Sequence, residues 1–314
     1  MREISIFSGT AHRNLAAEIC GHLDVPLQPA VVRRFATDCL EVQLQSNCRE
    51  RDVFLIQPLS APVQEHLVEL LLMLDAARGA SAARVTAVIP HYAYARSDKK
   101  TMPRVSIGGR LVADLLVTAG ASRVLTMTLH SPQVHGFFSV PVDHLHALRE
   151  IAAHFRAQDL SNSVVVSPDL GNAKTAAALA RMLGLPVAAG AKERISDEKV
   201  TITSIIGEVA GRNVIVLDDE IARGTTIVEL LGKLREHGAR SVKIACTHGL
   251  FCDGALKRIV AWPEVLQVVC TNTVAITESE RDEKLHVISV APALAEAIRR
   301  IHEGESVSAL FDPH

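Results

Sequence analysis

The chain has 314 residues, of which 48 % are hydrophobic. At roughly 150 residues per domain this length predicts about two domains, and the composition supplies each with a core, which excludes a disordered chain and a small disulfide-bonded scaffold. The 33 lysines and arginines nearly balance the 35 acidic residues, giving a net charge of −2, so no global field attracts nucleic acid or an anionic membrane. Any anionic ligand must be held by a local site.

The N-terminal sequence and the cysteines predict a cytoplasmic protein. MREISIFSG carries charges at Arg2 and Glu3 and then begins a strand, unlike a signal peptide. The longest uncharged stretch, residues 124–142, contains two histidines and two prolines and cannot span a bilayer. The six cysteines form no CxxC pair and show no zinc-ligand spacing with histidine, which is typical of reduced thiols.

Short β-branched runs alternate with helix-length amphipathic segments over nearly the whole chain. Strands are predicted, in chain order, at 4–9, 52–57, 84–92, 123–130, 164–169, 185–190, 213–220, 241–249, 266–272 and 285–291. Helices are predicted between them at 62–80, 109–121, 173–184, 225–239 and 292–304. This alternation predicts the α/β class, with mostly parallel sheets flanked by helices.

A domain boundary is predicted near residues 141–150, where one series of strands and helices ends and a second begins. This gives an N-terminal domain of residues 1–146 and a C-terminal domain of residues 147–314 with similar layouts. In open parallel sheets, ligands bind beyond the carboxyl ends of the strands, so candidate residues are expected there.

The strongest local signal is the segment NVIVLDDEIARGTTIVELLGKL, in which a strand, two acids, a Gly/Thr turn and a helix follow one another. The strand brings Asp218 and Asp219 to the sheet edge. At the helix start, free N–H groups and the helix dipole favour a phosphate beside Gly224, Thr225 and Thr226. Acids and a phosphate site together suit a sugar phosphate. The alternative is that a threonine merely caps the helix and the acids are solvated.

This segment resembles the ribose-phosphate binding loop of type I phosphoribosyltransferases and of ribose-phosphate pyrophosphokinases. Further segments favour the pyrophosphokinases: FSGTAH, NCRERDVFLIQ, YARSDKK, LTMTLHSPQVHGFF, VVVSPDLGNAKTAA and AKERISDEKV. The likeness runs from about residue 7 to the C-terminus. It implies phosphoribosyltransferase-like domains and transfer of the β,γ-diphosphoryl group of ATP to the 1-hydroxyl of ribose 5-phosphate, with release of AMP.

The resemblance also implies which residues bind ATP. No GxxxxGK[ST] or GxGxxG motif is present, so neither a P-loop nor a dinucleotide fingerprint holds the triphosphate. The residues implied to line the ATP site are Arg96, Asp98, Lys99 and His130. His130 and Asp169 are implied to lie near Mg²⁺, the expected cofactor, for which a carboxylate oxygen is a suitable ligand. Without the resemblance, His130 and His135 are ordinary histidines near a strand end, and His135 has no assigned role.

The segment AKERISDEKV, residues 191–200, lacks apolar periodicity and is dense in charge, which predicts a mobile surface loop. In the family this loop closes over the reactants. Its Lys-x-Arg pair is implied to stabilise the charge on the transferring group, so Lys192 and Arg194 are the expected catalytic pair.

Three further residues match family positions. Phe35 in RRFATD matches an aromatic residue that contacts adenine, with an ordinary packed phenylalanine as the alternative. Arg49 and Ser81 match positions that bind regulatory phosphate or ADP. The resemblance further implies a homo-oligomer, commonly a hexamer, with adenine sites at subunit contacts.

The chain departs from the family pattern in the acidic loop and near Phe35. Ala222 and Arg223 stand where an acid and a threonine are common, and Cys39 stands where a glutamate is common. Because a guanidinium binds phosphate in bidentate fashion, Arg223 is a candidate ligand of the 5-phosphate.

The leading hypothesis is therefore an active ribose-phosphate pyrophosphokinase that binds ATP and ribose 5-phosphate, with no nucleic-acid or membrane partner. Ala222 and Cys39 motivate one alternative, a non-catalytic regulatory homologue that assembles with an active enzyme. A phosphoribosyltransferase is a third possibility, but it leaves YARSDKK and AKER unexplained.

Overall fold

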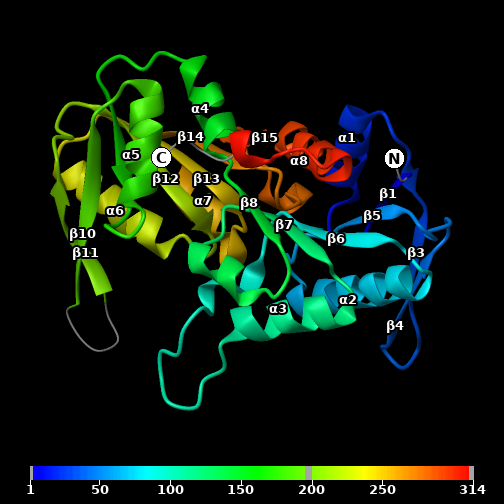
Figure 1. The fold of residues 1–314 in the computed structure, drawn as a ribbon. Coiled ribbons are helices and arrows are strands. Elements are labelled where there is room, and N and C mark those ends of the chain that lie inside the picture. The colour runs from blue at the N-terminus through cyan, green and yellow to red at the C-terminus, as the bar shows by residue number, and fades with distance from the viewer. Residues whose placement is uncertain (1–2, 195–199, 311–314) are drawn as a thin grey trace. The chain divides into compact units, whose positions relative to one another are not determined.

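The computed structural model describes residues 3–194 and 200–310. The chain divides into two compact units (Figure 1). The first contains Met1–His146, Thr273–Ala275 and Ser289–Pro313, and the second contains Ala147–Asn272 and Ile276–Ile288. Each unit has its own main sheet and its own core, so the predicted α/β class is confirmed.

The first unit is built on a six-stranded parallel sheet with the order β2-β1-β5-β6-β7-β8. Its strands are β1 Ile4–Ser8, β2 Leu27–Gln28, β5 Asp52–Ile56, β6 Arg84–Ile89, β7 Arg123–Met127 and β8 Val142–Leu145. Every residue of β5 is buried, as expected for a parallel strand covered on both faces. Two pairs of helices cover these faces (Figure 1): α2 Val63–Gly79 with α3 Gly108–Ala119, and α1 Arg13–Leu23 with α8 Ala291–Glu303.

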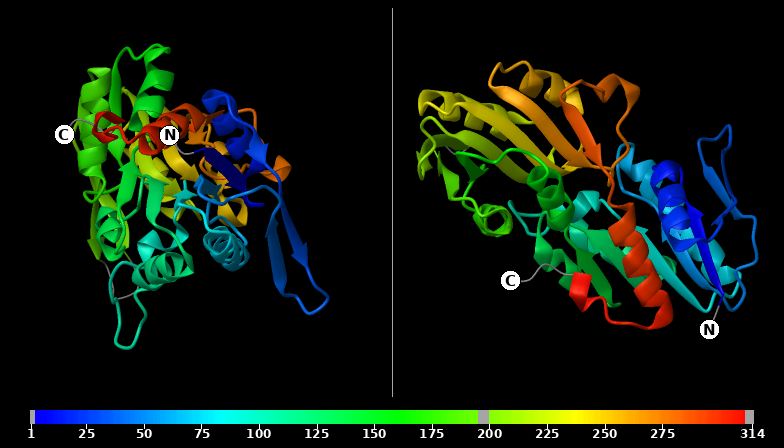
Figure 2. Two further views of the ribbon diagram at one scale, coloured as in Figure 1. Left: turned by 45° about the vertical axis from the view of Figure 1, so that its right-hand side comes forward. Right: turned by 90° about the horizontal axis from the view of Figure 1, so that it is seen from above.

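A separate antiparallel hairpin, β3 Ala30–Arg34 and β4 Leu40–Leu44, projects from the first unit in both views of Figure 2. β4 contacts α2, and Arg34 forms an ion pair with Glu65 in the first turn of that helix. The sequence does not predict these two strands, because their residues are exposed or half-buried and form no apolar run.

The C-terminal helix α8 belongs to the first unit, whereas the division at residue 146 assigned it to the C-terminal domain. Its apolar residues Leu294, Ile298 and Ile301 are buried, and the helix packs beside α1. Chain order alone does not show which sheet a terminal helix covers. The structure shows that the chain returns to its first unit after β15.

A buried carboxylate joins α8 to the sheet. Asp52 is only 1 % exposed, and its Oδ1 accepts a hydrogen bond from Arg84 Nε at 2.8 Å. His302 Nδ1 lies 2.9 Å from Asp52 Oδ2, and Arg84 Nη2 donates to the Ile301 carbonyl at 2.9 Å. Asp52 of β5 and Arg84 of β6 therefore both hold the C-terminal end of α8.

We expect Asp52→Asn to lower the free energy of unfolding by about 1.5–3 kcal/mol, because charge-assisted hydrogen bonds to a buried group are lost without a change of shape. Urea denaturation measures this. The matched control is Asp75→Asn, whose ion pair with Arg78 is 66 % exposed at the carboxylate and is worth at most about 1 kcal/mol. Equal midpoints for both variants would contradict a special role for Asp52.

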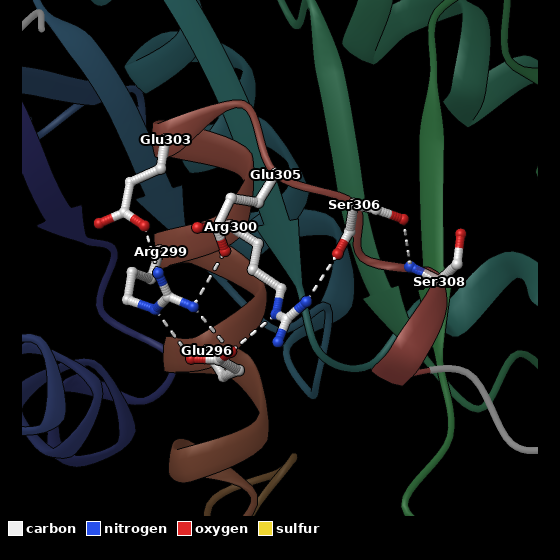
Figure 3. A network of polar contacts seen from close by, with 7 residues as sticks. All are labelled: Glu296, Arg299, Arg300, Glu303, Glu305, Ser306 and Ser308. Carbon is white, nitrogen blue, oxygen red and sulfur yellow. Dashed lines mark hydrogen bonds and ion pairs between the residues drawn. The ribbon is translucent and has the colours of Figure 1, made fainter.

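The C-terminal half of α8 and the residues just after it carry an ionic network (Figure 3). Arg299 Nε donates to Glu296 Oε2 at 2.9 Å and pairs with Glu303 and Glu305. Hydrogen bonds from Arg299 and Arg300 lower the pKa of Glu296 to about 2. The stabilisation from Glu296 is thus present above about pH 4.5 and is lost as the pH falls towards about 2.

The second unit is built on a seven-stranded sheet with the order β11-β10-β9-β12-β13-β14-β15, parallel except between β10 and β11. Its strands are β9 Ser163–Ser167, β10 Val187–Arg194, β11 Val200–Ile206, β12 Asn213–Ile221, β13 Ser241–Gly249, β14 Val265–Thr271 and β15 Leu285–Ile288. The helices α4 Leu148–Arg156 and α5 Ala173–Leu183 pack on one face, and α6 Thr225–Glu236 and α7 Ala255–Val260 pack on the other.

Every strand predicted from the sequence is present; 241–249 has the predicted bounds, and the others differ at one or both ends. The predicted surface loop at residues 191–200 is wrong for the described residues: 191–194 continue β10, and Val200 begins the antiparallel β11. Residues 195–199 lie outside the described part of the chain. An edge hairpin tolerates charged residues, which is why this segment has no strand-like apolar run. Across residues 3–194 and 200–310, no helix is long and apolar enough to cross a membrane.

Candidate active site

The carboxyl end of β12 carries acidic residues where they were predicted. β12 lies between β9 and β13, with Asp218 in register with Cys246 of β13. Leu217 and Cys246 are buried, while Asp218 and Asp219 are half-buried. The continuous buried run of β12 therefore ends at Leu217, and the acids follow it at the carboxyl end of the strand, ahead of the buried Ile221.

The charge of a third carboxylate acts on this pair. Asp169 follows β9, the strand beside β12, and Asn172 donates its backbone N–H to Asp169 Oδ1 at 3.1 Å. Burial, together with the charges of Asp219 and Asp169, raises the pKa of Asp218 well above its ordinary value. Crowded carboxylates of this kind are stabilised by a cation or by hydroxyl donors.

The segment that follows β12, residues 222–226, is called the sugar-phosphate loop below. Gly224 adopts a left-handed conformation with φ 66°, which glycine reaches without a steric penalty. Thr225 begins α6, a helix of 12 residues. Because the N-cap residue is a glycine, no N-cap side chain occupies the first N–H groups of α6. The helix start is therefore suited to an anion.

Arg223, which was expected to bind the 5-phosphate, forms an ion pair with Asp253. Its Nε lies 3.1 Å from Asp253 Oδ2, and both side chains are largely exposed. Asp253 belongs to the short 3₁₀ helix η3 Cys252–Gly254, which follows β13. Arg258 of α7 donates from Nη2 to the Arg223 carbonyl at 2.7 Å. Asp253 and Arg258 were not singled out from the sequence, where the only signal is the Asp-Gly turn dipeptide at 253–254.

In the first unit, two segments of the predicted ATP side meet. Arg96 ends the 3₁₀ helix η1 Ala93–Arg96, and Asp98 follows it. Gln133 Nε2 donates to Asp98 Oδ2 at 2.5 Å. Although partial burial opposes it, hydrogen bonding from Ser131 and Gln133 lowers the pKa of Asp98. The loop after η1 is thus held against the segment after β7, which carries His130. Arg96, Lys99 and His130 are exposed at this place.

Phe35 lies in the turn of the β3–β4 hairpin and is 50 % exposed. The turn is held by hydrogen bonds between Phe35 N and the Cys39 carbonyl and between Asp38 N and the Phe35 carbonyl, both at 2.9 Å. The alternative of an ordinary packed core phenylalanine is wrong, because half of the side chain faces solvent.

Arg49 and Ser81 lie on neighbouring segments of the first unit. Glu50 N donates to the Ser81 carbonyl at 2.9 Å, just ahead of β5 and β6. Ser81 has a positive φ of 63°, and both residues are exposed. Both precede their strands, so they lie at the amino ends, away from the carboxyl ends that carry Asp98 and His130.

The predicted catalytic pair, Lys192 and Arg194, lies on β10, in register with Ile202 and Val200 of β11. Only their backbone belongs to the described part of the chain, and their side chains lie outside it.

The described residues contain no group of three or more His, Cys, Asp or Glu side chains arranged to hold a metal ion. Mg²⁺ is usually held by one or two carboxylates together with substrate phosphates and water, so it does not need such a group. The crowded carboxylates at the end of β12 and after β9 supply hard oxygen donors of this type.

The fold and the β12–α6 site define an α/β protein suited to bind a sugar phosphate at the carboxyl edge of a parallel sheet. Residues 4–120 match the family model described as the N-terminal domain of ribose phosphate pyrophosphokinase. Residues 190–312 match the phosphoribosyl synthetase-associated domain. The chain belongs to the ribose-phosphate pyrophosphokinase family.

Similar proteins span the whole chain. A Streptomyces coelicolor protein that bears the ribose-phosphate pyrophosphokinase name is 71 % identical over 312 residues, 99 % of this chain and 98 % of its own. The ribose-phosphate pyrophosphokinase of Deinococcus radiodurans is 50 % identical over 98 % of this chain and 97 % of its own. The crystal structure of phosphoribosylpyrophosphate synthetase from Mycobacterium smegmatis has a TM-score of 0.91 at 40 % identity, covering 96 % of this chain and 100 % of that one.

Proposed function

We propose that the chain transfers the β,γ-diphosphoryl group of ATP to the 1-hydroxyl of ribose 5-phosphate, giving 5-phosphoribosyl 1-pyrophosphate and AMP. The observation that carries this is the acidic end of β12 leading through Gly224 into α6, in a chain of the ribose-phosphate pyrophosphokinase family. The protein is accordingly a transferase of nucleotide biosynthesis.

The second unit binds ribose 5-phosphate in this proposal. The 5-phosphate lies at the start of α6, where the N–H groups and hydroxyls of Thr225 and Thr226 are donors. Asp218 and Asp219 accept hydrogen bonds from the sugar hydroxyls. The raised pKa of Asp218 supports this role, because hydroxyl donors and a cation relieve the crowding of its charge.

ATP binds to the first unit, with Arg96 and Lys99 supplying cations for its phosphates and Asp98 and His130 completing the site. The hydrogen bond from Gln133 to Asp98 supports this assignment, since it joins the two segments that carry these residues. Phe35 contacts the adenine of ATP held by a neighbouring subunit. Its exposure at the tip of a projecting hairpin supports such a contact.

Mg²⁺ is the proposed cofactor; Asp169 would be its protein ligand, and His130 would lie near it. When bound, it supplies positive charge to the phosphate oxygens. The hard oxygen of Asp169 suits this ion, while the imidazole of His130 is a softer donor that suits a place near the ion through water.

The transfer needs alignment and positive charge more than a covalent nucleophile. The 1-hydroxyl oxygen forms a bond to the β-phosphorus, the bond from that phosphorus to the oxygen of the α-phosphate breaks, and the hydroxyl proton is released. AMP leaves with the bridging oxygen. Lys192 and Arg194 stabilise the charge that develops on the transferring group.

Three further properties belong to this proposal. The enzyme assembles as a homo-oligomer, a hexamer in the form the family resemblance implies, and it works in the cytoplasm. Arg49 and Ser81 bind a regulatory phosphate. Their adjacent, exposed positions at the amino ends of β5 and β6 support a site separate from the carboxyl edge.

The deciding experiment measures AMP and 5-phosphoribosyl 1-pyrophosphate after incubation of the purified chain with ATP, Mg²⁺ and ribose 5-phosphate. We expect the two products in equal amounts and no AMP when ribose 5-phosphate is omitted. A folded protein that forms neither product at any phosphate or Mg²⁺ concentration would overturn the proposal. That result would favour the regulatory homologue, which binds and assembles without turnover.

A further inference from the structure

We infer that Arg258 and Asp253 are positioning residues that hold the sugar-phosphate loop in the geometry needed to bind ribose 5-phosphate. The inference rests on the proposed function, because it names the residues that shape the proposed phosphate site. Neither residue contacts the substrate in this proposal. Both act through Arg223 and Gly224.

Arg258 joins the loops that follow two neighbouring strands. Its Nη2 donates to the Arg223 carbonyl at 2.7 Å, after β12, and its Nη1 donates to the Asp253 carbonyl, after β13. A guanidinium is a rigid planar fork, so two donors on one side chain fix the separation of the two carbonyls. The single ammonium of a lysine cannot reproduce this bridge.

The same two loops are joined a second time by side chains. Arg223 Nε lies 3.1 Å from Asp253 Oδ2. The backbone is joined as well, since Leu250 N and Phe251 N both donate to the Ile221 carbonyl at 3.0 Å. The sugar-phosphate loop is therefore clamped to the turn at 250–254 from both of its sides.

Helix α7 also fills the space beneath the loop. A Cβ atom at Gly224 would lie 3.1 Å from Ile259 Cδ1 and 3.3 Å from Ala255 Cβ. Gly224 thus rests directly on α7, and the position of α7 determines where α6 begins. Since the N-cap residue of α6 is this glycine, the direction of its first N–H groups depends on these contacts.

The turn at 250–254 needs such external support. Phe251 and Asp253 adopt left-handed conformations with φ of 42° and 54°, which non-glycine residues keep only when their surroundings hold them. Phe251 is buried in the core of the second unit, whereas Asp253, Gly254 and Lys257 line a cavity of about 350 Å³, so packing does not hold the Asp253 side of the turn. The contacts of Arg258 and Asp253 take the place of that packing.

The test compares Arg258→Lys and Asp253→Asn with wild type by steady-state kinetics and by calorimetric titration with ribose 5-phosphate. We expect KM and Kd for ribose 5-phosphate to rise about 10-fold in Arg258→Lys and about two- to fivefold in Asp253→Asn, because the ion pair of Asp253 is exposed. KM for ATP and the melting temperature should change little. The matched control is Arg156→Lys. Arg156 of α4 also donates to a backbone carbonyl, that of Met182, but on the other face of the sheet.

A second set of variants separates positioning from direct phosphate binding by Arg223. In a clamp, Arg223→Gln, Asp253→Asn and the double variant have equal effects, because each removes the same ion pair. A loss of ribose 5-phosphate affinity in Arg223→Gln alone, with tighter binding in Asp253→Asn, would overturn the inference. Unchanged KM and Kd in all variants would also overturn it. If Arg258→Lys does not fold, the Arg223 and Asp253 variants decide.

Calorimetric titration of wild type with ribose 5-phosphate distinguishes a failure of the positioning role from a failure of the proposed function. If wild type neither turns over nor binds ribose 5-phosphate, the proposed function fails. If wild type does both and the clamp variants match Arg156→Lys, only the positioning role fails.

Discussion

Replacing Lys192 by alanine is expected to lower kcat by roughly 10³-fold, with less than about a threefold change in the Kd for ribose 5-phosphate. The proposed reaction moves a highly charged diphosphoryl group, and a cation that acts only on the transition state changes kcat rather than binding. Lys192 lies on β10 of the second unit, the strand next to β9, after which Asp169 follows. Initial rates of AMP formation and calorimetric titration measure the two quantities.

The matched control is Lys233→Ala on α6, which removes a lysine that pairs with Glu236 and has no proposed contact with either substrate. It should keep the wild-type kcat. Arg194→Ala should resemble Lys192→Ala, and the double variant should lose less than the product of the two single losses, because groups that act on one transition state are not additive. A wild-type kcat in Lys192→Ala would refute the catalytic role.

The β12–α6 segment could be predicted from the sequence because each of its parts is a local signal. A run of apolar β-formers ends in acids, and a glycine and two threonines precede an amphipathic helix. The structure keeps the order strand, turn and helix at these residues. The environment of Asp218 could not be predicted, since its burial and the nearby charge of Asp169, which follows the neighbouring strand β9, depend on how the strands of the sheet are ordered.

The features that escaped prediction are those fixed by contacts between distant segments. Arg223 was a candidate phosphate ligand, yet it pairs with Asp253, 30 residues further on, because parallel β13 returns beside β12. Helix α8 returns to the first unit through Asp52. Such pairings depend on which sheet edge and which helix face meet, and no local pattern contains that information.

Replacing Asp218 by asparagine is expected to raise the KM for ribose 5-phosphate about 10- to 100-fold, because a charge-assisted hydrogen bond from the sugar is lost. The same change is expected to raise the melting temperature of the ligand-free protein at neutral pH. Burial, Asp219 and Asp169 oppose the charge of Asp218, so the charged carboxylate destabilises the folded state. The neutral asparagine does not carry this penalty. The site thus trades stability for binding.

The stability difference between Asp218→Asn and wild type is expected to depend on pH. The folded pKa of Asp218 lies above its unfolded value, so the folded state binds the extra proton and the penalty is complete only above the folded pKa. The advantage of Asp218→Asn over wild type should therefore shrink as the pH falls through that value and vanish below the unfolded pKa. Calorimetric melting at neutral and at acid pH, without ligand, measures both ends of this range.

Asp159→Asn is the matched control, because the pKa of Asp159 is lowered whereas that of Asp218 is raised. Hydrogen bonds from the Ser161 backbone and side chain lower the pKa of the exposed Asp159, so asparagine should bring no stability there and should leave the KM for ribose 5-phosphate unchanged. A melting temperature of Asp218→Asn below that of wild type at neutral pH, with an unchanged KM, would show that Asp218 serves the fold and not the sugar. A higher melting temperature together with a raised KM would show that Asp218 binds the sugar at the expense of stability.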